Sequence, residues 1–128
     1  MILNEFLDKA EKEHIIATLI KYYKVKPRIA YKPIDDYAYY NVDRNTIEIS
    51  TKHKKISDEK QFITTMLHEI NHAMDAKKFG RKKYKIEYGI EGEIAQQKGG
   101  DFHDDNWFEL KAEKWARKEY PKWKNKFK

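Results

Sequence analysis

The 128-residue sequence contains no cysteine, which limits both how the fold can be held together and which metal sites it can build. Disulfide bonds, thiolate metal ligands and a cysteine nucleophile are all excluded. Any zinc ion would therefore be bound by histidine and carboxylate side chains.

Long apolar runs are also missing. The first ten residues mix Asn4, Glu5, Asp8 and Lys9 with apolar residues, so this segment has the composition of neither a signal peptide nor a membrane span. No other apolar run is long enough to cross a bilayer, and there is no internal repeat. We therefore expect a soluble cytoplasmic protein that forms one domain of ordinary size over residues 1–128.

Acidic residues are outnumbered by basic ones. Lysine and arginine total 27 against 21 aspartates and glutamates, which gives a net charge of +6. Basic clusters occur at residues 52–55, 81–85 and 122–128. Such clusters suit a nucleic acid or an acidic protein, but no nucleic-acid-binding motif accompanies them. We therefore favour solvated loops and a solvated tail, with a nucleic-acid partner as the alternative.

The most informative segment is His68-Glu69-Ile70-Asn71-His72, which reads H-E-x-x-H. Residues four apart on a helix share one face, so both imidazoles can reach one metal ion. Glu69 lies between them and could take a proton from a zinc-bound water, whose pKa the metal lowers to about 7. The segment therefore predicts His68 and His72 as zinc ligands and Glu69 as a general base.

The surrounding residues favour a buried helix over a chance occurrence of two histidines on an ordinary amphipathic helix. The three motif side chains fall on one stripe, and apolar residues fall on another. Ser57 or Asp58 can cap the helix, and Gly80 can end it, which predicts a helix over residues 58–79. The apolar stripe consists of Phe62, Ile63, Met66, Leu67, Ile70, Ala73 and Met74.

The segments before this helix predict one more helix and a small sheet. Apolar spacing predicts a helix over residues 2–23, and residues 28–31 are a short strand candidate. Residues 37–42 and 46–50 alternate around a turn, as expected for a hairpin. With a further helix near the C-terminus, we expect an α+β fold in which a small antiparallel sheet packs on the H-E-x-x-H helix between N- and C-terminal helices.

A catalytic zinc site needs three protein ligands and an open position, so a third ligand is required besides the two histidines. The candidates are His103, Glu109 and Glu113. Glu109 and Glu113 lie four apart, so one could bind the metal while the other orients a ligand histidine from one turn away. Asp75 is a minor candidate for the same orienting role.

The two glutamates lie in the predicted C-terminal helix, which begins near residues 104–106 and runs to Tyr120, just before Pro121. The preceding stretch, residues 86–95, fits a short helix and a loop equally well. Small residues at positions 112 and 116 would let the C-terminal helix approach another helix closely.

This helix carries a family resemblance. Glu109-Leu110-Lys111-Ala112-Glu113-Lys114-Trp115-Ala116, followed by Pro121, resembles the E-x-x-A-[N/D]-x-F-A…P helix of the ImmA/IrrE-type metallopeptidases. The order of a strand at 46–50, a short connection and the H-E-x-x-H helix is also typical of that family. The resemblance covers roughly residues 37–121, and Glu113 departs from it because the family usually has Asn or Asp there.

The resemblance implies a zincin-like fold of the gluzincin type. It implies Zn²⁺ bound by His68, His72 and Glu109, with Glu69 as general base. The implied activity is that of a metalloendopeptidase that cleaves a regulatory protein, such as a repressor of a mobile element or phage. The strand at 46–50 would then pair with the extended substrate.

His103 supports a different interpretation. SprT-like proteases, which act on DNA-associated proteins, use a third histidine after H-E-x-x-H, and residues 103–110 faintly resemble that arrangement. A third alternative is a catalytically silent, zinc-stabilised binding or virion protein, but such a protein would not need Glu69. If His103 is not a ligand, we favour an ordinary loop residue over one that stabilises the oxyanion. A tyrosine could also stabilise the oxyanion, and the candidates are Tyr39, Tyr40, Tyr84 and Tyr88.

Overall fold

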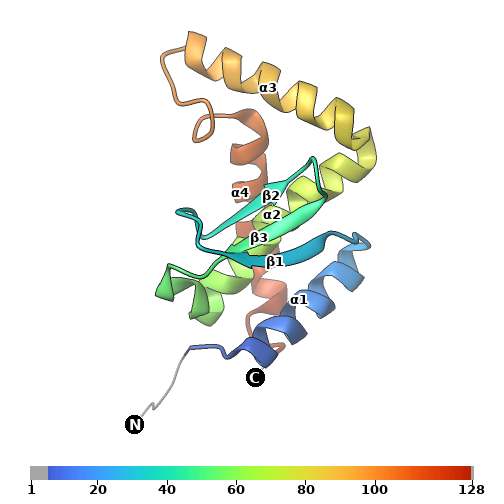
Figure 1. Cartoon of the computed structure of the whole chain (residues 1–128), viewed down its shortest axis with the longest axis vertical. Helices are drawn as coiled ribbons and strands as arrows, with labels where there is room; N and C mark the ends of the chain where they lie inside the picture. Colours follow the sequence, from blue (N-terminus) through green and yellow to red (C-terminus); the bar gives the residue numbers. More distant parts are fainter. Residues whose placement is uncertain (1–5, 128) are drawn as a thin grey trace.

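The computed structural model describes residues 6–127, which form an α+β fold of four α-helices and one three-stranded mixed sheet (Figure 1). The predicted α+β class is confirmed. Among the described residues, no helix combines the length and the apolar character needed to cross a membrane. In chain order the elements are α1 (Lys9–Tyr23), β1 (Arg28–Lys32), β2 (Ala38–Asn41), β3 (Thr46–Ser50), the 3-10 turn η1 (Lys54–Ser57), α2 (Glu59–Phe79), α3 (Arg81–Gln97) and α4 (Trp107–Trp123).

The sheet has the strand order β1-β3-β2, so it is mixed and the prediction of an antiparallel sheet is wrong. β2 and β3 form the predicted antiparallel hairpin, with Tyr39 opposite Glu48. β1 runs parallel to β3, with Arg28 opposite Thr46. The connection at residues 33–37 reverses the chain, but β3 then returns between β1 and β2 rather than beyond β2.

This strand order also changes which backbone can accept another chain. β3 is hydrogen-bonded to a strand on each side, so it has no free edge. The prediction that residues 46–50 pair with an extended substrate is therefore wrong. Within residues 6–127, the strands at the two edges of the sheet are β1 and β2.

α2 is the central helix of the molecule and contacts α1, α3, α4 and β2. The Asp58 side chain accepts a hydrogen bond from the backbone N–H of Gln61 and caps its N-terminus. The helix ends before Gly80, whose φ of 89° lies in the region that favours glycine. The H-E-x-x-H segment therefore lies in the middle of the best-buried helix, whose fully buried side chains are Phe62, Ile63, Met66, Leu67 and Ile70.

The helices at either side of α2 differ from the predicted ones. α1 begins only at Lys9, where Asp8 and Glu11 form a capping box, and the predicted start at residues 2–5 lies outside the described residues. Residues 86–95, left open between helix and loop, belong to α3. α4 continues past Pro121 to Trp123, because Trp123 is buried and its indole N–H donates to the Tyr23 hydroxyl.

Gly92 is the point at which α3 approaches the loop before α4. A Cβ atom at this position would overlap the ring of Phe102, whereas a Cβ at Gly89 in the same helix would meet nothing within 4 Å. We expect Gly92→Ala to reduce the free energy of unfolding by about 1–3 kcal/mol. Gly89→Ala should raise it by up to about 1 kcal/mol, because alanine is the better helix former. Urea unfolding measures both, and equal shifts in the two variants would contradict this packing.

Candidate metal centre

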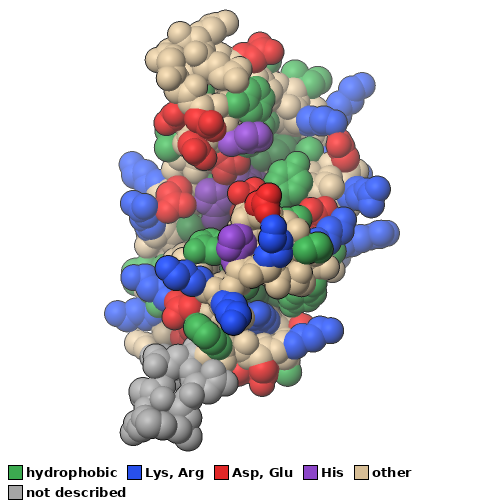
Figure 2. Space-filling view, turned by 60° about the vertical axis from the view of Figure 1, so that its left-hand side comes forward, with side chains coloured by type: hydrophobic (Ala, Val, Ile, Leu, Met, Phe, Trp, Pro, Cys, Tyr) green, Lys and Arg blue, Asp and Glu red, His purple; other side chains and the backbone are tan. Residues whose placement is uncertain are grey.

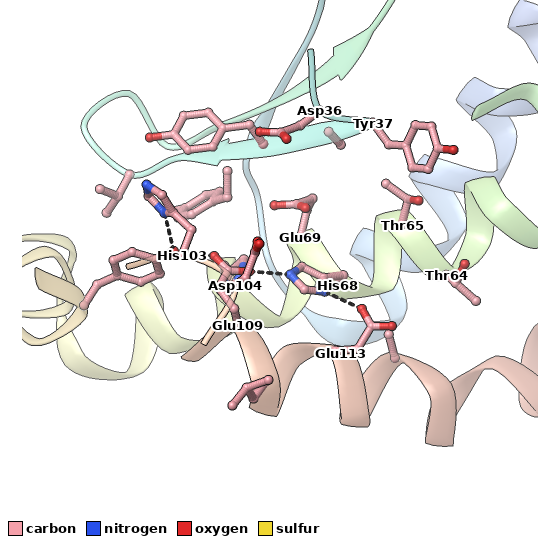
Figure 3. Close-up of a pocket in the computed structure, with 18 of the residues that line it drawn as sticks. Asp36, Tyr37, Thr64, Thr65, His68, Glu69, His103, Asp104, Glu109 and Glu113 are labelled. Carbon is pink, nitrogen blue, oxygen red and sulfur yellow. Dashed lines mark hydrogen bonds and ion pairs between the residues drawn. The ribbon is translucent and has the colours of Figure 1, made fainter. Parts of the chain in front are cut away.

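Two histidines of α2 and one glutamate of α4 converge on a common centre. Figure 3 shows the side chains of His68 and Glu109 turned toward each other. Glu109 Oε1 lies 2.7 Å from His68 Nε2 and 3.0 Å from His72 Nε2. One ligand atom from each of the three residues lies within 4.8 Å of the others. The group could therefore hold a metal ion.

Asn106 fixes where α4 begins and thus where Glu109 lies. Its side-chain oxygen accepts a hydrogen bond from the Phe108 N–H, and its amide donates to the backbone oxygen of Tyr88. Asn106 is fully buried, so this cap is held from both α3 and α4. Glu109 then falls in the first turn of α4, on the side that faces α2.

Small side chains allow α4 to lie close to α2. Ala112 and Ala116 are buried at this helix contact, as the spacing of small residues suggested. The close approach places Glu113 Oε2 3.3 Å from His68 Nδ1. The longer side chain of glutamate thus reaches the imidazole from a position where the resembled family has Asn or Asp.

Each histidine presents Nε2 to the centre and Nδ1 to a partner. His68 Nδ1 faces Glu113, and His72 Nδ1 lies 2.9 Å from the hydroxyl of Tyr84. Glu113 is held in turn by Arg117, at 3.1 Å. Partners of this kind fix the ring orientation and tautomer of metal-binding histidines. Tyr84 is buried on α3, and the sequence suggested it only as one of four candidates to stabilise the oxyanion, not as a partner of His72.

Glu69 is buried next to this centre and is not part of the ligand group. Figure 3 shows its carboxylate between His68 and the sheet. Burial raises the pKa of Glu69, although the two neighbouring histidines and the backbone N–H of Tyr40 act in the opposite direction. The site thus contains a carboxylate that is more basic than an exposed one.

Tyr88 connects the group formed by His68, His72 and Glu109 to the loop before α4. Its hydroxyl donates to Glu109 Oε2 at 2.5 Å and lies 3.0 Å from His103 Nδ1. Burial and the contact with Glu109 raise the pKa of Tyr88, so the phenol stays protonated and remains a donor. His103 itself is exposed and lies outside the group of three.

Asp75 does not lie against either imidazole. It is buried, and its Oδ2 forms an ion pair with Lys111 Nζ at 2.7 Å. Lys111 also donates to Asn71, so these residues form a second polar contact between α2 and α4. The expectation that Asp75 orients a ligand histidine is therefore wrong, because its carboxylate turns to Lys111.

Without a metal, the contact between His68 and Glu109 is an ion pair. Burial opposes a charge on His68, but the hydrogen bond to Glu109 and the charges of Glu69 and Glu113 outweigh it and raise the pKa of His68 from 6.5 to about 9. Burial likewise opposes a charge on Glu109, yet its hydrogen bonds to the two histidines hold its pKa well below the usual range. At neutral pH the metal-free centre therefore carries a proton on His68.

Metal binding must displace that proton, because only the neutral imidazole is a ligand. We therefore expect the affinity for Zn²⁺ to rise about tenfold per pH unit from neutral pH up to the His68 pKa of about 9. The profile should flatten above that pH. Competition with a chromophoric chelator at a series of pH values measures it. An affinity that is constant between pH 7 and 9 would contradict the protonated His68.

The centre lies in a cleft of about 830 Å³. Residues of β2 form one wall, α2 forms the floor, and α3, the loop at 102–104 and α4 form the other wall. A cleft of this size can enclose part of a drug-sized ligand or of an extended peptide. The three candidate ligands and Glu69 are thus open to a bound molecule on one side.

No family model, curated protein or solved structure matches this chain. The chemistry of the cleft is therefore argued from the donor group, the contacts of its members and the buried Glu69. The donor group itself joins two distant parts of the chain, since His72 on α2 and Glu109 on α4 are separated by 37 positions.

Proposed function

We propose that the protein is a zinc-dependent metalloendopeptidase that hydrolyses peptide bonds in an extended protein segment. The observation that carries the proposal is the buried carboxylate of Glu69 beside two histidines and a glutamate. A metal site that only stabilises a fold has no use for such a base. This argues against a catalytically silent binding protein.

Zinc fits the residues that the centre offers. Two imidazole nitrogens and one carboxylate are a common ligand set of catalytic zinc, and such sites keep a fourth position open. His68 and His72 would bind through Nε2 and Glu109 through a carboxylate oxygen. Bound there, zinc would polarise the substrate carbonyl and lower the pKa of a water molecule.

Glu69 would act as the general base. Its raised pKa makes it a better proton acceptor than an exposed carboxylate, and the Tyr40 N–H holds its orientation. It would take the proton of the attacking water and pass it to the leaving amine. His103, exposed beside Tyr88, is the candidate donor to the oxyanion.

The edge of β2 would bind the substrate backbone. The backbone oxygen of Tyr37 accepts a hydrogen bond from the backbone N–H of Ser50. Because hydrogen-bonded pairs alternate along an antiparallel ladder, the backbone N–H and C=O of Tyr39 also point toward β3. The backbone groups of Ala38 and Tyr40 therefore point toward the outer edge of β2. The Tyr40 N–H on that edge already reaches Glu69. An extended peptide added along β2 would therefore pass directly over the general base.

The resemblance to ImmA/IrrE-type metallopeptidases supports a regulatory protein as the substrate. The SprT-like alternative would need His103 in the ligand group, and its contact with Tyr88 gives it another role. Glu109, rather than His103, contacts Nε2 of both His68 and His72.

Zinc content and peptide cleavage test the proposal together. We expect one zinc ion per chain by elemental analysis, and new peptide termini when the protein is incubated with a diverse peptide mixture and followed by mass spectrometry. Chelation should abolish the cleavage, and added zinc should restore it. A zinc-loaded protein that cleaves nothing in the mixture would contradict the proposal.

A further inference from the structure

The cleft has the opposite charge to the rest of the molecule. The chain has a net charge of +6, yet only two of the residues that line the cleft, Lys85 and Arg117, are Lys or Arg. Figure 2 shows acidic side chains gathered beside the histidines of this face, with lysine and arginine on its flanks. Six lining residues are acidic: Asp36, Asp43, Glu69, Asp104, Glu109 and Glu113.

Neither basic residue is free to receive a negatively charged ligand. Lys85 Nζ pairs with Asp43 at 2.8 Å, and Arg117 pairs with Glu113 at 3.1 Å. Each base thus neutralises an acidic residue within the cleft itself. An acidic peptide would have to break one of these pairs to gain a partner.

The remaining four carboxylates divide into two pairs. Glu69 and Glu109 lie at the metal centre, where the two charges of a bound divalent ion balance them. Asp36 and Asp104 are exposed and form no ion pair with any described residue. These two carboxylates therefore leave the metal-loaded cleft with a net negative charge.

Asp36 and Asp104 come from different walls of the cleft. Asp36 precedes β2, and Asp104 lies in the loop before α4. Figure 3 shows Asp36 on the sheet side of the centre and Asp104 on the side of that loop. Both carboxylates line the cleft and are exposed, so a ligand in the cleft can reach them. A carboxylate without an ion-pair partner can accept charge-assisted hydrogen bonds from a lysine or arginine side chain.

We infer that the cleft selects peptide segments rich in lysine or arginine, with Asp36 and Asp104 as the residues that determine this preference. The inference rests on the proposed function, because it assigns the substrate class of the same cleft. A cleft lined by charges of one sign concentrates ligands of the opposite sign. It also rejects acidic segments, whose carboxylates would meet unpaired carboxylates.

Peptide binding without turnover tests this preference. The zinc-loaded Glu69→Gln protein is titrated with two fluorescent peptides that differ only in carrying lysine or glutamate at the same positions, and anisotropy is measured. We expect the lysine peptide to bind about tenfold more tightly, because two exposed ion pairs each contribute a few-fold. The difference should shrink as salt is added.

Reversing the charges of Asp36 and Asp104 then tests whether these two residues cause the preference for the lysine peptide. In the same background, Asp36→Lys combined with Asp104→Lys should abolish or invert the difference between the two peptides. The matched control is Glu13→Lys combined with Glu93→Lys, two exposed positions outside the cleft that change the net charge equally. The control pair should keep the preference.

The outcomes separate this inference from the proposed function. Equal binding of the two peptides, or a preference that the control pair also removes, would overturn the inference. If the wild-type protein then still cleaves peptides in a zinc-dependent way, the proposed function stands. The inference is supported if the lysine peptide binds more tightly and only the Asp36 and Asp104 variant loses this preference. If the wild-type protein then cleaves no peptide, that result overturns the proposed peptidase activity but not the binding preference.

Discussion

Replacement of Glu69 by glutamine is expected to leave zinc bound and to lower kcat/KM for peptide cleavage by about 10²–10⁴-fold. Glu69 is not one of the three residues whose ligand atoms converge, so the metal should be retained. The glutamine carbonyl can still accept the hydrogen bond from the Tyr40 N–H, which preserves the local structure. The amide cannot accept a proton from water, so only the base is removed.

The measurement combines zinc content with turnover of one defined peptide. Glu13→Gln on α1 is the matched control, because it makes the same chemical change at an exposed position outside the cleft. It should retain both zinc and activity. Undiminished cleavage by metal-loaded Glu69→Gln protein would remove Glu69 from the mechanism.

Replacement of Glu109 by alanine is expected to reduce bound zinc from one ion per chain to nearly none, and to abolish cleavage with it. Glu109 Oε1 is the atom that meets both imidazoles, so its loss leaves only two ligands. Elemental analysis after dialysis against trace zinc measures the change. The loss of zinc should be much larger than in a variant of a residue that contacts only a ligand side chain and not the metal.

Glu113→Ala provides that comparison. Glu113 contacts His68 Nδ1 rather than the centre, so its removal should weaken zinc binding by about 10–100-fold without abolishing it. Full zinc in Glu109→Ala protein would exclude Glu109 as a ligand and direct attention to His103 and a SprT-like site. His103→Ala would then be expected to lose the metal.

The central helix was predictable because several local signals agree. The apolar stripe, the Asp58 cap and Gly80 all act within one helix, and they give its boundaries to within a residue. α3 was ambiguous because Ile86 and Ile90 are 55% and 44% exposed, which blurs the amphipathic pattern that marks a helix. The direction of β1 could not be predicted, because strand order depends on how distant segments meet rather than on local sequence.

In the candidate centre, too, features set by local sequence were predictable and features set by the meeting of distant segments were not. The two histidines follow from helical spacing alone. Residue types left His103, Glu109 and Glu113 open as the third ligand, and only the family resemblance favoured Glu109. The contact of Tyr84 with His72 was not predicted, because it depends on how α3 crosses α2 after Gly80. Asp75 was a plausible partner by spacing, but its carboxylate turns toward Lys111 instead.

The placement of the donor atoms on α2 and α4 has a consequence for the lifetime of the protein. A metal ion held by His72 and Glu109 would act as a reversible cross-link between two residues 37 positions apart, and the segment between them includes all of α3. Loss of the ion would remove this link, and the two helices would then be held together by the side-chain packing and the ion pairs between α2 and α4. The segment between the two residues should open more often, and proteases should cleave it faster in the metal-free protein than in the metal-loaded one.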